Sequence, residues 1–138
     1  MAKDIGERGL ERGQAGQSLS ELSIVLVLFL VVMFGIVDGS RLILAHNAVS
    51  LSAREGVRYA VVRGASSGRR ASAADITAFV QSKTVGVPVD VEVTWNPDSN
   101  PGSTVVVQVT NVFTPVAPFP LVPRSVNLTS RARMVISR

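Results

Sequence analysis

The strongest constraint on this chain is a run of apolar residues that begins at Leu22 and ends at Val37, interrupted only by Ser23 and Gly35. Extended back to Leu19, the run as an α-helix would be roughly 28 Å long, close to the ~30 Å hydrocarbon core of a bilayer. A helix that is apolar on every side needs lipid or a large protein core around it, and a chain of 138 residues is too short to supply that core. We therefore predict a helix that spans or is anchored in a membrane.

Charge divides the sequence into parts. Residues 1–16 are polar and glycine-rich, with three Lys/Arg against three Asp/Glu, and they look like a soluble leader rather than a folded element. Residues 39–138 hold eleven Lys/Arg against five Asp/Glu, giving +6. A basic distal part can attract an anionic polymer or lipid. Nucleic acid is not expected, because the few aromatic residues do not interleave with the arginines as a stacking platform requires.

Apolar and small residues continue beyond the run at steps of three and four, which predicts that the helix extends as an amphipathic segment. The stripe consists of Leu42, Ala45, Ala48, Val49, Ser52, Ala53, Val57 and Ala60. Gly64 suits a helix end, because glycine tolerates the left-handed conformation there. We expect one helix over residues 17–63, with 17–38 in the membrane and 39–63 as the amphipathic extension.

The remaining residues, 64–138, predict a small α/β head. Ser72 followed by Asp75 resembles a capping box, and it would start a short helix that buries one face. The buried face would consist of Ile76, Phe79 and Val80. Alternating apolar and polar residues then predict three strands, near residues 89–95, 104–113 and 126–136. Turn residues at 96–103 and prolines within 115–123 separate the strands.

These elements together define the expected fold class. It is α+β and pilin-like, with a long N-terminal helix that is membrane-spanning and then amphipathic. A second short helix and a small three-stranded antiparallel sheet complete it.

A glycine and a glutamate mark the start of the apolar run, in the order Gly16-Gln17-Ser18-Leu19-Ser20-Glu21. A carboxylate at the edge of a membrane span is costly unless it stays at the interface or finds a partner. The pattern resembles the processing site of the type IV pilin superfamily, in which a membrane-embedded aspartic peptidase cuts after a glycine. In that superfamily a glutamate is the fifth residue of the mature chain, as Glu21 is when Gln17 is the first.

The resemblance becomes narrower over two further segments, GIVDGSR at residues 35–41 and AREGVRYAV at residues 53–61. They are similar to the TadE-like family of tight-adherence pili. The matching positions, besides Glu21, are Gly35, Asp38, Arg41, Ala53, Arg54, Glu55, Arg58, Tyr59 and Ala60. The chain departs from the family at Val27, where a proline is common, and at Ser20, where an apolar residue is common. The resemblance covers about residues 13–63.

Gly35 and Gly39 form a small-x-x-x-small pair at the distal end of the run. Such a pair permits two helices to approach closely, so it would lie on a contact face in a bundle of packed pilin helices. Helix flexibility or chance explains the pair equally well.

No residue pattern points to catalysis. His46 is the only histidine and there is no cysteine, which excludes disulfides and thiolate metal sites. The sequence holds neither a phosphate-binding glycine loop nor a nucleophile elbow. We expect no enzyme activity, cofactor, metal or small-molecule substrate.

The resemblance implies a minor pilin or pseudopilin that helps to assemble a tight-adherence (type IVc-like) pilus or a related secretion machine. Its partners would be prepilin peptidase, other pilin-like subunits, the inner-membrane assembly platform and membrane lipid. It would lie in the bacterial inner membrane with a cytoplasmic N-terminus, and could enter the extracellular pilus after assembly. The alternatives are a signal-anchored envelope protein with a basic binding head, and a secreted domain cut downstream of Val37.

Overall fold

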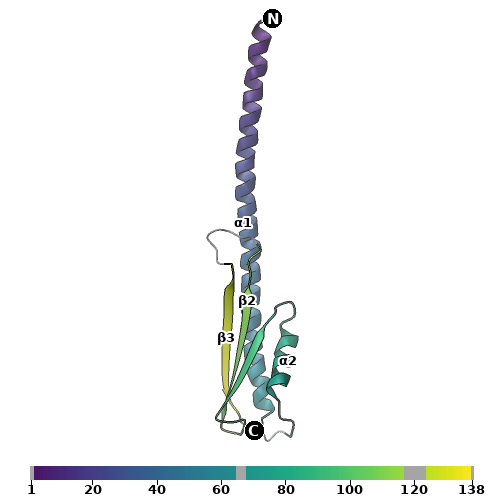
Figure 1. Cartoon of the computed structure of the whole chain (residues 1–138), viewed down its shortest axis with the longest axis vertical. Helices are drawn as coiled ribbons and strands as arrows, with labels where there is room; N and C mark the ends of the chain where they lie inside the picture. The colour runs from purple at the N-terminus through teal and green to yellow at the C-terminus, as the bar shows by residue number, and fades with distance from the viewer. Residues whose placement is uncertain (1, 65–67, 117–123, 138) are drawn as a thin grey trace. The chain divides into compact units, whose positions relative to one another are not determined.

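The computed structural model describes residues 2–64, 68–116 and 124–137, with side chains from residue 16 onward. The elements, in chain order, are α1 (Ala2–Val62), α2 (Ala73–Lys83), β1 (Asp90–Asn96), β2 (Thr104–Phe113) and β3 (Val126–Val135) (Figure 1). The predicted α+β class is confirmed, with its long helix, short second helix and three-stranded antiparallel sheet. Much of the predicted proline-rich loop, residues 117–123, lies outside the described residues, as do residues 65–67.

The long helix α1 begins at Ala2, well before the predicted start at Gln17. The expectation that the leader is not a folded element is therefore wrong for its backbone. Extending a formed helix adds one hydrogen bond for each residue that is fixed and escapes the cost of nucleation, so a polar segment can join a strong helix. At its other end α1 stops at Val62, close to the predicted stop at Gly64.

The chain forms two compact units, Met1–Asp38 and Gly39–Arg138. In the first unit the large apolar side chains of the run are 40–70% exposed, on every side of the helix. Among the described residues, one helix segment, Gly16–Val62, is long and apolar enough to cross a membrane, judged by length and composition. The side chains of its most apolar stretch are not buried within the protein. These properties fit a single N-terminal membrane anchor.

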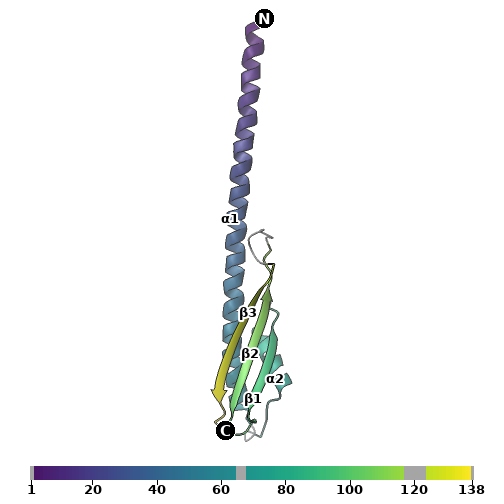
Figure 2. The ribbon, with the colours of Figure 1, turned by 60° about the vertical axis from the view of Figure 1, so that its left-hand side comes forward.

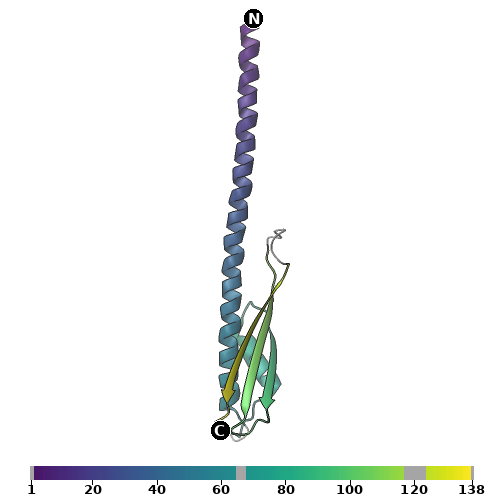
Figure 3. The ribbon, with the colours of Figure 1, turned by 90° about the vertical axis from the view of Figure 1, so that its left-hand side faces the viewer.

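The second unit contains a sheet with the strand order β1-β2-β3, in which both neighbouring pairs are antiparallel (Figures 2 and 3). At its centre Val93 lies opposite Val107, and Val107 lies opposite Ala132. Each strand pairs with the next one along the chain, so two hairpin connections build the whole sheet.

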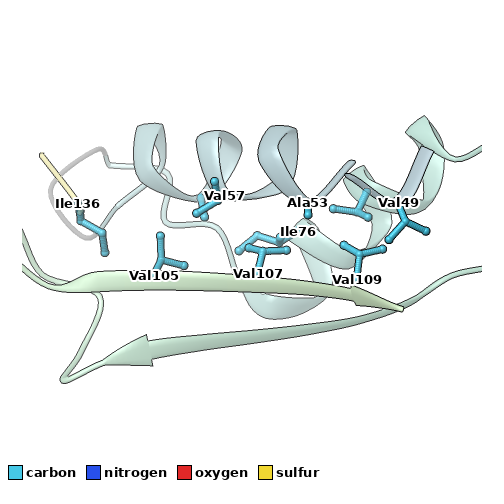
Figure 4. Packing of buried hydrophobic residues seen from close by; sticks show 10 residues of the cluster. Val49, Ala53, Val57, Ile76, Val105, Val107, Val109 and Ile136 are labelled. Atoms are coloured by element: carbon cyan, nitrogen blue, oxygen red, sulfur yellow. The ribbon is translucent and has the colours of Figure 1, made fainter. Parts of the chain in front are cut away.

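One face of this sheet packs against α2 and against the α1 residues of the second unit (Figure 4). The fully buried cluster consists of Val49, Ala53, Val57, Ala60, Ile76, Val80, Val105, Val107, Val109 and Ile136. Four of the eight residues of the stripe predicted on the long helix and two of the three residues predicted on the short helix thus belong to the core. Leu42 and Ala48 of the stripe are half-buried, as is Phe79. Burying these side chains is the main force that holds the head together.

Ile136 closes the far end of this core. Only 1% of its surface is exposed, and its backbone hydrogen-bonds to the hairpin that joins β1 to β2. Its N–H donates to the carbonyl of Ser103 at 2.8 Å, and its carbonyl accepts from the N–H of Gly102 at 2.9 Å. Gly102 has φ +91°, a conformation that side chains other than glycine rarely adopt, so this position favours glycine.

The predicted capping box at the start of α2 is confirmed. The Oγ of Ser72 accepts from the Asp75 N–H at 3.2 Å, and Asp75 Oδ2 accepts from the Ser72 N–H at 2.9 Å. The backbone hydrogen bond from Ser72, followed by the one from its hydroxyl, holds the pKa of Asp75 below the ordinary value of 3.8. The box satisfies two backbone donors that the first turn would otherwise leave without partners.

Candidate functional site

The predicted processing site lies inside α1, on an exposed helix surface. The Ser20 hydroxyl donates to the Gly16 carbonyl at 3.0 Å, and Gln17 Nε2 donates to Glu21 Oε1 at 3.3 Å. The carboxylate of Glu21 is exposed and lies one helical turn from Gln17. The structure thus places Gly16, Gln17 and Glu21 along little more than one turn.

The helical backbone at Gly16 bears on any cleavage there. A peptidase that binds extended backbone must first unwind this turn. Glycine makes unwinding easier, because it is about 1 kcal/mol less favourable than alanine inside a helix. Its missing side chain and its weak helix preference therefore both suit a cleavage site at this position.

The two glycines at the distal end of the run contribute nothing to packing within the chain. A Cβ atom built on Gly35 or Gly39 would meet nothing within 4 Å. The space beside both residues is open, so a neighbouring helix could approach closely there. Asp38 lies between them and is half-buried.

Arg41 follows the apolar run and contacts the head. Its guanidinium carbon lies 5.4 Å from the centre of the Phe113 ring, a cation–π distance. Phe113 ends β2 and is 7% exposed. This family-motif position thus links α1 to the sheet within the second unit.

The segment AREGVRYA contributes mainly to the core of the head. Ala53, Val57 and Ala60 are buried, and Gly56 lies where α1, α2 and β2 meet. A Cβ atom on Gly56 would lie 2.7 Å from Cγ2 of Val80 and 3.2 Å from Cγ1 of Val107. Only a glycine leaves room for this close approach. Sequence reasoning missed the role of Gly56, although a glycine within a strong helical pattern was a usable signal.

Tyr59 connects α1 to α2 through a ring contact. The ring of Tyr59 stacks on that of Phe79 in α2. The guanidinium carbon of Arg63, which directly follows α1, lies 4.0 Å from the centre of the Tyr59 ring. The Lys83 ammonium lies 5.4 Å from the Phe79 ring. A charged group therefore lies beside each ring of the pair, and such contacts add to the apolar burial.

The other charged motif positions remain on the surface of α1. Arg54 and Arg58 are exposed one turn apart, and Glu55 is half-buried. His46 is exposed on the same helix. Within the part of the chain that the structure describes, no group of three His, Cys, Asp or Glu side chains could hold a metal ion.

Comparison with known families agrees with the resemblance. A family model described as TadE-like protein matches residues 16–58. The match begins at the proposed cleavage site, includes Glu21, Gly35 and Gly39, and ends at Arg58. Residues 16–58 are therefore similar to the TadE-like family, and the resemblance inferred from the sequence is confirmed over that range. Neither the curated proteins nor the solved structures gave a match.

The match carries a functional class. It suggests a pilin-like protein associated with the Tad pilus, in a family that is structural rather than catalytic. The apolar helix and the small α/β head of this chain fit that class.

Proposed function

We propose that this chain is a TadE-like minor pilin or pseudopilin, a structural subunit in the assembly of a tight-adherence pilus or a related secretion machine. One observation carries the proposal. Gly16 and Glu21 stand at the spacing of a prepilin processing site, at the start of the matched segment and directly before the exposed apolar run. A generic membrane anchor has no need of this pair.

Cleavage after Gly16 would change the surroundings of Glu21. In the uncut chain Glu21 lies far from both ends of α1, although its side chain is exposed. Removal of residues 1–16 would create an α-amino cation on Gln17, one turn away. It would also bring the positive end of the helix dipole close to the carboxylate, which is favourable. The cut thus turns an unfavourable interfacial charge into half of an ion pair.

The second half of that pair is the new amino group, either of the same chain or of a neighbouring subunit. Pairing between subunits would let Glu21 set the axial position of one helix against the next. The open surface at Gly35 and Gly39 would then receive the adjacent helix. The expected partners are prepilin peptidase, other pilin-like subunits, the inner-membrane assembly platform and lipid.

The proposed location follows from the same features. The apolar helix would anchor the chain in the bacterial inner membrane, with the leader in the cytoplasm and the head outside. Assembly would carry the helix out of the bilayer and into the fibre or its base.

The test is the intact mass of the membrane-extracted chain, expressed with and without a matching prepilin peptidase. We expect a chain that begins at Gln17 only when the peptidase is present. Gly16→Leu should abolish the cut, whereas Gly13→Ala, at another glycine of the leader, should leave it intact. A full-length chain in both samples would instead indicate a signal-anchored envelope protein with a basic head.

The role of Glu21 needs a separate readout. Glu21→Gln keeps the size and removes the charge, so it should spare cleavage and reduce piliation. Unchanged piliation in this variant would refute the pairing of the carboxylate with an amino group, whatever the result of the cleavage test.

A further inference from the structure

The face of the sheet that points away from α1 and α2 carries opposite charges on its two outer strands. The outward side chains are exposed on β1 at Asp90, Glu92 and Thr94, and on β3 at Thr129, Arg131 and Arg133. The central strand β2 carries neutral residues between them, of which Gln108 and Thr110 are half-buried and Val106 is buried. One edge of this outer face is therefore acidic and the other is basic.

The strand register fixes how the two charged columns are aligned. Glu92 lies opposite Gln108, and Gln108 lies opposite Arg131. Two strand spacings separate Glu92 from Arg131, about 10 Å, which is too far for a direct ion pair within one sheet. The hydroxyls of Thr110 and Thr129 lie 3.3 Å apart on the adjacent row, which agrees with this alignment.

We propose that the outer face binds the same face of a second copy of this chain. Across the sheet from β1 to β3, the row of Glu92 carries an acidic, a neutral and a basic residue. The row of Asp90 has only the acidic end of this order, and the row of Arg133 has only the basic end. A half-turn about an axis parallel to β2 exchanges the outer strands and turns the two faces toward each other. Glu92 of one copy then lies against Arg131 of the other, and Gln108 lies against its own counterpart. This is the self-complementary geometry of a two-fold dimer.

Among these outward residues, Glu92 and Arg131 are the opposite charges that share a row. Asp90 shares its row with Thr129, and Arg133 shares its row with Thr94. The half-turn therefore opposes Glu92 and Arg131 directly, twice, and it brings Asp90 diagonally to Arg131 and Arg133 diagonally to Glu92. An anionic ligand would use the arginines alone and leave the acidic column opposed to it, so the charge pattern favours a second copy.

The axis also preserves direction. Because it runs parallel to β2, the strands of both copies point the same way. Three short strands cover less area than a stable soluble dimer buries, and exposed ion pairs are individually weak. The pairing is therefore one between chains already concentrated in a membrane or a fibre. It does not depend on the proposed pilin role.

The test uses the absence of cysteine from the chain. The full-length protein with Gln108→Cys is treated in native membranes with a short bismaleimide. The matched control is Ser82→Cys, which is exposed on α2, away from the proposed contact. We expect the Gln108→Cys chain to cross-link to itself about tenfold more than the control, since the axis passes beside this residue.

Charge reversals in the Gln108→Cys chain complete the test. Glu92→Arg and Arg131→Glu should each lower the cross-linked fraction about tenfold, because two attractive contacts become repulsive. The double variant should restore it. Equal cross-linking at Gln108→Cys and Ser82→Cys, or a double variant as poor as the single ones, would overturn the proposal. Running the series with and without prepilin peptidase separates its outcome from that of the pilin role.

Discussion

The ring of Tyr59 on α1 stacks on the ring of Phe79 on α2, with 4.3 Å between the ring centres and 18° between the planes. Tyr59 belongs to the motif AREGVRYA, which suggested the TadE-like family at the outset. Its contacts lie within the chain, so this motif position stabilises the head whether or not it also contacts a partner.

Removing the Tyr59 ring should weaken the junction of the two helices. We expect Tyr59→Ala to lower the free energy of unfolding of the head by about 2 kcal/mol, because a half-buried ring and its stacking partner are lost. Tyr59→Phe keeps the stack and should stay close to wild type. Denaturant unfolding of the full chain in detergent, followed by the fluorescence of Trp95, measures both. Equal unfolding midpoints for Tyr59→Ala and wild type would show that the stack contributes nothing.

A methyl group at Gly56 should be more harmful than its small size suggests. We expect Gly56→Ala to cost about 1–3 kcal/mol, because the new Cβ overlaps Val80 and the packed core resists the shift. The control is Gly39→Ala, whose Cβ meets open space, so its stability should be unchanged or higher. Adding Val80→Ala to Gly56→Ala should cost less than the two single changes summed. Strict additivity would contradict the overlap.

The capping box should make stability depend on pH. Because the folded chain lowers the pKa of Asp75 below 3.8, its carboxylate stabilises the fold above that value. The contribution is lost as the pH falls through the lower, folded pKa. We expect Asp75→Asn to be less stable than wild type at pH 7, and the difference to shrink toward zero at strongly acidic pH. Unfolding at both pH values checks this, and a constant difference would contradict it.

Filling the open space beside Gly35 and Gly39 should disturb association and spare the head. We expect Gly35→Leu with Gly39→Leu to reduce helix association of the full chain in detergent about fivefold, measured by energy transfer between labelled copies. Val37→Leu is the control, since it adds bulk on another side of the same helix. Unfolding of the head should be unchanged in both variants. A similar loss of association with Val37→Leu would remove any special role for the glycines.

Local signals let the sequence predict much of this fold. β2 forms over Thr104–Phe113 as expected, because alternation and flanking turn residues are properties of neighbouring positions. The same is true of the capping box. The start of α1 was missed because helix extension is cooperative and needs no apolar pattern.

Features that depend on tertiary contact could not be predicted. The close approach at Gly56 exists only once α2 and β2 are both in place. The alignment of Glu92 with Arg131 depends on two strand registers at once, and a shift of one residue in either would move a charge to the other face.

Ile136 has a consequence for the order of events during synthesis. The core that Val49 begins near the start of the head is completed by a residue that leaves the ribosome much later. Until then the apolar stripe of α1 lacks part of its cover, and a partly made head exposes surface that proteases and chaperones recognise. The head is therefore expected to reach its full stability only after Ile136 has left the ribosome.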